Sequence, residues 1–348
     1  MQFTPASEAL TGGCRDAVLL NDWHVVALSS EVVVGELVPT TLFERDLVVW
    51  RDEARAVHVW DDLCLHRGAR LSKGFIQDDK VVCPYHGWNY DKSAQCVLMP
   101  AAPRETPMRK ARATAHHAVE KYGFVWACVG TPERDVPPFP EWDDPSYKKV
   151  VCGPYTFKSG YRAIENFIDA THFPFVHAGL NGIQDNPDTI PPYEVDETEE
   201  GLATSAIRVT QPFGDPRNIP VVADYKYKCF RPLVAYFKKQ VFISDPELAA
   251  RGGDDEYLAI FFAAQAVSET DSLVRVVVGM NFAEMPSDAQ VRDRQALVLG
   301  QDAAIVAMQR PERMPLDLRM ELHHRTDLMG QKYRTWMRNM GVTYGAIV

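Results

Sequence analysis

The chain has 348 residues, of which 46% are hydrophobic and 24% charged, a composition that excludes a disordered or fibrous protein. Lysine and arginine together number 37 and aspartate and glutamate 47, so the formal net charge is −10. This balance argues against nucleic-acid binding, which draws its affinity from a basic surface. The sequence shows no signal-peptide pattern, and no apolar stretch approaches the roughly 20 residues of a membrane span. Its seven cysteines are widely spread and do not suggest a disulfide framework. We therefore expect a cytoplasmic protein with neither a membrane nor a nucleic-acid partner.

The first part of the chain has the pattern of short β-strands. Runs rich in valine, leucine and tryptophan recur between residues 23 and 128 and are separated by glycine, proline and charged turns. Five prolines then fall within residues 131–145, a composition that favours an extended linker. The sequence therefore predicts an all-β domain over residues 20–130, a Pro-rich linker over 131–145 and a second domain over 146–348.

The second domain combines helical and strand patterns. A helix is expected from about Arg162 to His172, and alternating segments between residues 202 and 282 predict an antiparallel sheet. A long helix is expected over about 286–309, where Pro311 stops it. The fold class predicted for the whole chain is α+β.

Two short segments each contain one cysteine and one histidine. Cys64 and His66 form the first pair, and Cys83 and His86 form the second after an interval of sixteen residues. Two cysteines and two histidines could form a tetrahedral zinc site, although zinc modules usually pair like with like. The mixed pairs favour a two-metal cluster in which one metal takes both thiolates and the other takes both imidazoles.

The pattern C-L-H followed by C-P-Y-H-G-W resembles the Rieske [2Fe–2S] motif. The resemblance implies that Cys64 and Cys83 hold one iron, and that His66 and His86 hold the other. Neutral imidazoles in place of two thiolates raise the reduction potential of such a cluster. Because a Rieske cluster only transfers electrons, the motif fits an electron carrier or an oxygenase, and the residues beyond position 130 require a function of their own.

A second set of polar residues lies between positions 166 and 177. On a helix, Asn166, Asp169 and His172 would share one face. His177 follows Pro174, which would bend or end the helix and allow the two imidazoles to approach one another. We take Asn166 and Asp169 as candidate catalytic residues beside a metal site, with Asp169 orienting a ligand rather than binding the metal.

Two histidines and one carboxylate are the ligand set of mononuclear non-haem Fe(II). His172 and His177 supply the imidazoles, and Asp302 is the candidate carboxylate. It lies within the predicted long helix among small and apolar neighbours, where a buried acid requires a partner charge or a metal. Asp293 and Glu312 are flanked by arginines and are expected at the surface.

The order of the two motifs resembles the oxygenase component of Rieske non-haem iron oxygenases. The segment N-D-W-H-V-V-A at 21–27 is similar to the phthalate-dioxygenase and demethylase branch of that family. The segments at 333–336 and 341–345 are similar to hydroxylases of saxitoxin-type guanidinium alkaloids. The resemblance implies a helix-grip catalytic domain, in which a curved antiparallel sheet surrounds a helix.

The resemblance also implies a reaction and its partners. Electrons from NAD(P)H would arrive through a separate reductase or ferredoxin, and the cluster would pass them to an iron held by His172, His177 and Asp302. This iron would activate O2 to hydroxylate or oxidatively demethylate a small organic substrate. The family works as a homotrimer, in which Asp169 would accept hydrogen bonds from His172 and from His86 of the partner subunit.

Two alternatives remain open at this point: a cis-dihydroxylating aromatic-ring dioxygenase, and a Rieske electron carrier without enzymatic activity. Substrate-pocket residues are expected from 181–192, from inward-facing sheet positions and from the stretch before Asp302.

Overall fold

The computed structural model describes residues 13–253 and 255–348, and the chain divides into two compact units. Unit 1 runs to Val136 and includes the short segment Ala266–Ser268, whereas unit 2 holds Pro137–Gln265 and Glu269–Val348. None of the helices in the described ranges is long and apolar enough to cross a membrane.

Unit 1 is built from two antiparallel sheets. The larger has the strand order β1-β10-β9-β4-β3-β2, with the bounds His24–Leu28, Phe124–Cys128, Ala115–Lys121, Val57–Asp61, Arg45–Arg51 and Leu37–Leu42. The smaller has the order β5-β6-β7-β8, with the bounds Phe75–Gln77, Lys80–Val82, Asn89–Tyr90 and Cys96–Leu98. Valine and aromatic residues favour half-buried strands of this kind. The strands carry three fully buried tryptophans: Trp50, Trp60 and Trp126. A four-residue helix, α2 (Ala17–Leu20), precedes the first strand.

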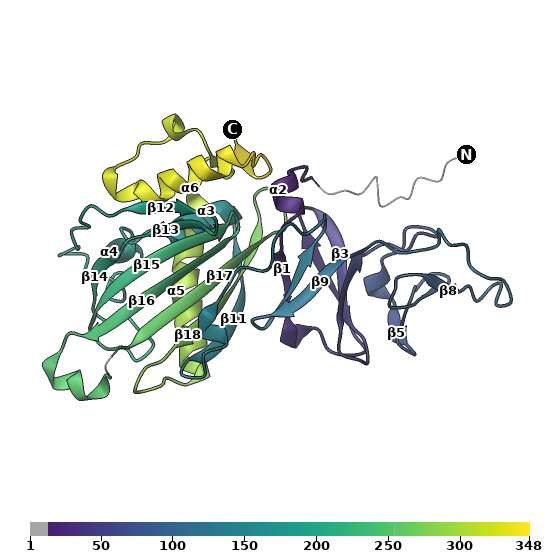
Figure 1. The fold of residues 1–348 in the computed structure, drawn as a ribbon, viewed down its shortest axis with the longest axis horizontal. Helices are drawn as coiled ribbons and strands as arrows, with labels where there is room; N and C mark the ends of the chain where they lie inside the picture. Colours follow the sequence, from purple (N-terminus) through teal and green to yellow (C-terminus); the bar gives the residue numbers. More distant parts are fainter. Residues whose placement is uncertain (1–12, 254) are drawn as a thin grey trace. The chain divides into compact units, whose positions relative to one another are not determined.

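Unit 2 contains a long antiparallel sheet with helices packed on it (Figure 1). Its order is β11-β18-β17-β16-β15-β13-β12, with β14 also paired to β15. In that order the bounds are Lys148–Phe157, Ser272–Met280, Tyr257–Ala266, Val234–Ile243, Val221–Arg231, Gly201–Thr204 and Val195–Thr198, with β14 at Ile207–Gln211. A two-stranded parallel pair joins β19 (Met314–Pro315) to β20 (Ala346–Ile347). This sheet-rich unit with helices, after an all-β first unit, confirms the predicted fold class.

The helices of unit 2 carry most of the predicted polar residues. They are α3 (Gly160–Phe167), α4 (Phe173–Val176), α5 (Asp288–Met308) and α6 (Leu328–Asn339). Figure 1 shows α5 running behind the strands and α6 beside β12 and β13. Helix α5 begins where Ser287 and Gln290 form a reciprocal capping box, which satisfies free backbone N–H groups of its first turn.

Short 3₁₀ helices lie in the connections: η1 (Ser29–Glu31), η2 (Leu71–Lys73), η3 (Pro140–Trp142), η4 (Pro246–Arg251), η5 (Leu318–Met320) and η6 (Arg325–Asp327). The Pro-rich segment 131–145 spans the end of unit 1 and the start of unit 2. Within unit 2, its Phe139 is buried against Phe261, and its Glu141 accepts a hydrogen bond of 2.9 Å from the Tyr236 hydroxyl.

The helix expected to reach His172 ends earlier than the sequence suggested. Helix α3 stops at Phe167, and α4 begins at Phe173, so Asp169 and His172 lie in the turn between them. The cause is the Asp169 carboxylate, which accepts hydrogen bonds from the backbone N–H groups of Thr171 (3.0 Å) and His172 (3.0 Å). An aspartate that bonds to nearby backbone N–H groups favours a turn over a continuing helix.

A buried ion-pair network fastens α6 to α3. The Arg334 guanidinium donates to both carboxylate oxygens of Glu165 (2.6 and 2.7 Å) and to Glu321 (2.7 Å). Arg162 donates to the same Glu321 at 2.7 Å. Two arginines and two glutamates therefore balance one another beneath the helix that leads into the Asp169 turn.

Arg334→Met should lower the free energy of unfolding of unit 2 by about 2 kcal/mol, because it leaves two partly buried carboxylates with less compensating charge. Urea unfolding followed by far-UV circular dichroism measures the change. Arg338→Met, on the exposed side of the same helix, is the matched control. If the two variants unfolded at the same urea concentration, the ion-pair network would not stabilise the packing of α6.

Candidate metal centres and substrate cavity

The four predicted cluster ligands come from two loops of unit 1 that meet. Cys64 and His66 follow β4, and Cys83 and His86 lie between β6 and β7. The His66 and His86 ring centroids are 4.5 Å apart, and the Cys64 and Cys83 thiols lie close enough to shift each other's pKa. The structure therefore brings the four side chains together.

Glycine closes both loops in the same way. The Gly68 N–H donates to the Cys64 carbonyl (2.9 Å), and the Gly87 N–H donates to the Cys83 carbonyl (3.0 Å). Both glycines have positive φ, 73° and 66°, a conformation that L side chains adopt only under strain. Each cysteine thus begins a tight turn that brings its histidine back beside it.

The environment of Cys64 and His66 favours the protonation states that metal ligands need, whereas the hydrogen bond with Cys64 and burial raise the pKa of Cys83. Hydrogen bonds from Cys83, from the Tyr90 hydroxyl and from backbone amides lower the pKa of the Cys64 thiol to about 6, against the effect of burial. Burial lowers the pKa of His66, and the charge of His86 adds to this. The buried Nδ1 of His66 has no hydrogen-bond partner within the described part of the chain. A thiolate and a neutral imidazole with a free lone pair fit a metal cluster.

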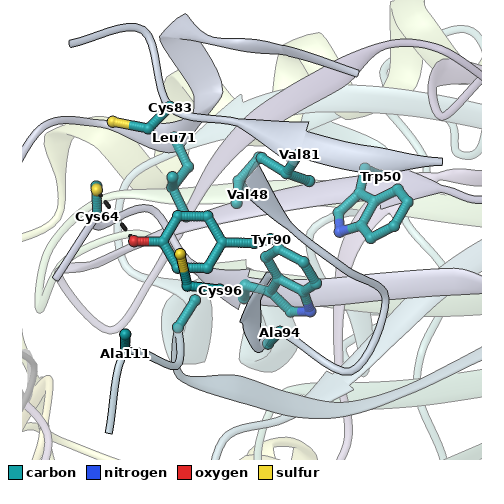
Figure 2. Packing of buried hydrophobic residues seen from close by; sticks show 12 residues of the cluster. Val48, Trp50, Cys64, Leu71, Val81, Cys83, Tyr90, Ala94, Cys96 and Ala111 are labelled. Atoms are coloured by element: carbon teal, nitrogen blue, oxygen red, sulfur yellow. Dashed lines mark hydrogen bonds between the residues drawn. The ribbon is translucent and has the colours of Figure 1, made fainter. Parts of the chain in front are cut away.

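Tyr90 joins the cluster loops to the core of unit 1. Figure 2 shows its ring among buried side chains, with its hydroxyl 3.1 Å from the Cys64 sulfur. His66 stacks on Trp88, with ring centroids 4.4 Å apart and planes 6° apart. Trp88 is the last residue of the C-P-Y-H-G-W pattern, whereas sequence reasoning did not single out Tyr90, two residues further on.

The second predicted set of ligands also comes together, in unit 2. His172 precedes α4, His177 follows it, and Asp302 lies on α5. The two Nε2 atoms are 3.3 Å apart, and Asp302 Oδ1 lies 3.5 Å from Nε2 of His172 and 3.1 Å from that of His177. Each of the three residues offers one ligand atom within 4.8 Å of the others.

Hydrogen bonds behind the two imidazoles decide which nitrogens face each other. Asp169 Oδ2 accepts from His172 Nδ1 at 2.9 Å, and Gln301 Oε1 lies 2.8 Å from His177 Nδ1. With the proton of each neutral ring on Nδ1, both Nε2 atoms present lone pairs toward the Asp302 carboxylate. Asp302 Oδ1 is buried without a hydrogen bond from any described residue. Three converging lone-pair donors repel one another unless a cation lies between them, so the residues fit a metal ion.

Asp169 is bound on both carboxylate oxygens. Oδ1 accepts from the Thr171 N–H and hydroxyl, while Oδ2 accepts from the His172 N–H and imidazole. Burial acts to raise the pKa of Asp169, but the hydrogen bonds from His172 and Thr171 outweigh it and keep the pKa below its ordinary value. Asn166 lies in the last turn of α3, where its carbonyl accepts from the Asp169 N–H (3.2 Å), and it does not line the cavity described next.

A cavity opens beside His172, His177 and Asp302, between α5 and the inner face of the sheet. Strand register places Tyr225, Lys239 and Leu258 in one row across β15, β16 and β17. Phe237 and Ile260 pair in the next row on the same face. Asn181 and the α5 residues Arg294, Gln295, Val298 and Leu299 complete much of the wall. The expected sources of pocket residues, the 181–192 loop, the sheet and the stretch before Asp302, all contribute.

Sequence reasoning missed Gln301, Lys239 and Arg294, and for two of them a signal existed. Lys238 and Lys239 are consecutive in a strand, so one of the two must face the core side of the sheet. Arg294 lies eight residues before Asp302, about 80° around the helix from it, so the two side chains can reach adjoining parts of one surface. Gln301 is a neighbour of the predicted ligand, but nothing in the sequence pairs it with His177.

Each of the two parts of the chain matches a known protein family. Residues 22–122 match the Rieske [2Fe-2S] domain, and residues 161–343 match the vanillate O-demethylase oxygenase C-terminal domain. The chain belongs to the Rieske oxygenases with this type of catalytic domain. It is therefore an enzyme, an oxygenase component of the monooxygenase and demethylase class.

Relatives support this assignment over most of the chain. A probable methylxanthine N7-demethylase, NdmC of Pseudomonas sp. (strain TJI-51), is 31% identical over 64% of this oxygenase and 77% of the relative. Methylxanthine N1-demethylase NdmA of Pseudomonas putida is 26% identical over 91% of this chain and 88% of its own. The structure of the P. putida CBB5 NdmA QL mutant with theobromine superposes with a TM-score of 0.75 and 25% identity, covering 92% of this chain and 90% of that one. The predicted family, fold and enzyme class are confirmed.

In this Rieske oxygenase, Tyr90→Phe should lower the reduction potential of the cluster by about 50 mV. A hydrogen bond to a ligand sulfur stabilises the more negative, reduced state, and losing about 1 kcal/mol of that preference corresponds to this shift for one electron. Spectroelectrochemical titration measures the potential. Tyr122→Phe, in the same unit and away from the cluster loops, is the control and should leave it unchanged. An unaltered potential in Tyr90→Phe would show that this hydroxyl does not tune the cluster.

Proposed function

We propose that the chain hydroxylates or oxidatively demethylates a small organic substrate at an iron held by His172, His177 and Asp302. The observation that carries this proposal is the convergence of three lone-pair donors at one edge of a largely apolar cavity, with an acceptor fixing the proton on the far side of each imidazole. The N-demethylases among the relatives favour monooxygenation over cis-dihydroxylation.

The proposed metal groups supply chemistry that side chains lack. When bound, the mononuclear iron would activate O2, and the cluster held by Cys64, His66, Cys83 and His86 would deliver single electrons. Because the sequence contains no nucleotide-binding glycine fingerprint, the electrons are proposed to come from NAD(P)H through a separate reductase or ferredoxin.

The protein's own groups bind, orient and exclude water. Asp169 and Gln301 hold the Nδ1 protons of the two imidazoles, which keeps both Nε2 lone pairs directed at one point. Apolar side chains of the sheet and of α5 hold a substrate methyl or methylene group near that point in a site with little water.

The overall reaction balances as follows. One oxygen atom of O2 is inserted into a C–H bond to give the alcohol. The other oxygen atom takes up two electrons and two protons and becomes water. When the C–H bond belongs to a methyl group on nitrogen or oxygen, the hydroxymethyl product splits into formaldehyde and the demethylated compound.

The proposal includes a homotrimer in which Asp169 links two subunits. The Asp169 side chain is 28% exposed while it holds His172, so part of the carboxylate remains accessible for His86 of the partner subunit. This arrangement would let electrons pass between subunits through a short chain of hydrogen bonds.

His172→Ala, His177→Ala and Asp302→Ala should each retain the red-brown cluster spectrum and lose the mononuclear iron together with turnover. Iron content should fall from about three to about two atoms per chain, because two protein ligands bind iron weakly. Metal analysis and visible absorption measure both quantities. Asp293→Ala, exposed on the same helix, is the control. Full iron and activity in Asp302→Ala would refute its assignment as a ligand.

Asp169→Asn should leave both metal sites loaded and reduce turnover at least tenfold. The amide offers one acceptor in place of two, so an N–H group faces either an imidazole N–H or a backbone N–H, a loss of roughly 1–3 kcal/mol. Single-turnover oxidation of the reduced cluster measures the electron transfer. Asp185→Asn, an exposed acid of the neighbouring loop, is the control. Electron transfer at the wild-type rate in Asp169→Asn would remove Asp169 from the proposed link.

A further inference from the structure

The cavity beside His172, His177 and Asp302 has a basic end. Its middle is apolar, with Phe237, Leu258 and Val298 among the lining residues, whereas Lys239 and Arg294 contribute two cationic side chains. Lys239 is 2% exposed and Arg294 8% exposed, so both charges are held away from bulk water. Buried cations of this kind require compensation.

Arg294 has only neutral partners among the described residues. Its Nη2 donates to Asn181 Oδ1 at 2.7 Å, and its Nη1 lies 3.4 Å from Asn218 Oδ1. No carboxylate of the described residues forms an ion pair with it within 4.0 Å. A guanidinium has five N–H donors, so three remain for other acceptors.

Lys239 also has only neutral hydrogen-bond acceptors among the described residues. Its ammonium donates to Gln211 Oε1 (2.9 Å) and to the Gly214 carbonyl, which uses two of its three N–H donors. Burial is the main reason that the pKa of Lys239 falls to about 7; the charge of Asp215 acts to raise this pKa, and the charges of Arg294 and Arg217 act to lower it. An anion in the cavity would restore the charged form.

Nearby carboxylates do not neutralise these two cations. Asp215 and Glu256 both pair with Arg217, at 2.7 and 2.8 Å. The three cations of this region, Arg217, Lys239 and Arg294, therefore face two carboxylates. One positive charge is left over beside the cavity whenever Lys239 is protonated.

Gln295 adds a neutral polar group to the wall of the cavity. Its side chain is 6% exposed and lines the cavity, yet its amide forms no hydrogen bond to any described residue. On α5 it lies seven residues before Asp302, which places it about 10 Å along the helix from the metal ligand and on the same side. An amide that lines a cavity without a protein partner can form hydrogen bonds there with a ligand or with water.

We propose that Arg294 and Lys239, assisted by Gln295, bind the anionic group of the substrate, so that the enzyme takes a small substrate with one negative charge. This inference rests on the proposed function of the same cavity. Arg294 and Asp302 are eight residues apart on α5, a rise of about 12 Å along the helix, which accommodates a substrate whose anionic group and reacting carbon lie on opposite sides of a ring. A cationic substrate such as a guanidinium compound would meet repulsion from both side chains.

The test compares three probes of matched shape that differ in charge: 4-methoxybenzoate, neutral 4-methoxybenzamide and cationic 4-methoxybenzylamine. Calorimetric titration of the wild-type holoenzyme should give an affinity for the anion at least tenfold above that for the amide, with the amine weakest. Arg294→Gln should reduce the affinity for the anion about 10- to 100-fold, the range expected for charged hydrogen bonds, while the affinity for the amide changes less than twofold. Lys239→Met should act in the same direction.

Each variant has a matched control and a check on folding. Arg292→Gln lies two residues away on the exposed side of α5, where Arg292 pairs with Asp288, and it should leave all three affinities unchanged. Lys238→Met changes the neighbouring lysine, which pairs with Glu141 on the other face of the strand. Cluster absorption and iron content report whether each variant is folded. Arg294→Lys keeps the charge and should keep most of the preference for the anion, so it decides the question if Arg294→Gln does not fold.

Equal affinities of the wild-type enzyme for the anion and the amide would overturn the inference, and so would equal effects of Arg292→Gln and Arg294→Gln. The proposed function fails in a different way. A protein that prefers the anion but binds no mononuclear iron would contradict the proposed function and leave the charge preference standing. An iron-loaded, active enzyme without any charge preference would contradict this inference alone.

Discussion

The chemistry of the catalytic unit depends on where two protons sit. Asp169 and Gln301 hold the protons of His172 and His177 on Nδ1, which directs the two Nε2 lone pairs at each other and at Asp302. Without those acceptors the imidazoles could rotate or take up a proton between them, and the three groups would no longer require a cation. The hydrogen bonds behind the two imidazoles are therefore as necessary to this arrangement as the imidazoles themselves.

Asp169 couples this constraint to the backbone. The same carboxylate that holds the His172 imidazole also accepts from the backbone N–H groups of Thr171 and His172. It thereby ends α3 and sets the turn from which His172 projects. A change at this residue would affect ring orientation and local fold together, which is why a loaded metal site is the informative control when turnover is lost.

Much of the fold could be predicted from the sequence, and so could the two groups of side chains that the structure brings together, because both rest on short-range patterns. The spacing of Cys64, His66, Cys83 and His86, and the small neighbours of Asp302, are visible in the sequence itself. The early end of α3 was not predicted, because the helical periodicity of the sequence continues past Phe167. The Asp169 carboxylate binds the backbone N–H groups of Thr171 and His172, and periodicity does not show this competition. Contacts across long sequence separations, such as Gln301 with His177, depend on packing that periodicity does not encode.

The basic end of the cavity shows how a violated pattern can mark a function. An inward position of β16 would be filled by an apolar residue if stability alone decided it, and Phe237 and Val241 fill the neighbouring inward positions. Lys239 between them places a cation in the core side of the sheet, and Arg294 adds a second from the facing helix. Two buried basic side chains beside the apolar middle of the cavity destabilise the ligand-free protein. That cost is offset when an anionic substrate enters, which links the substrate's charge to its position relative to the metal ligands.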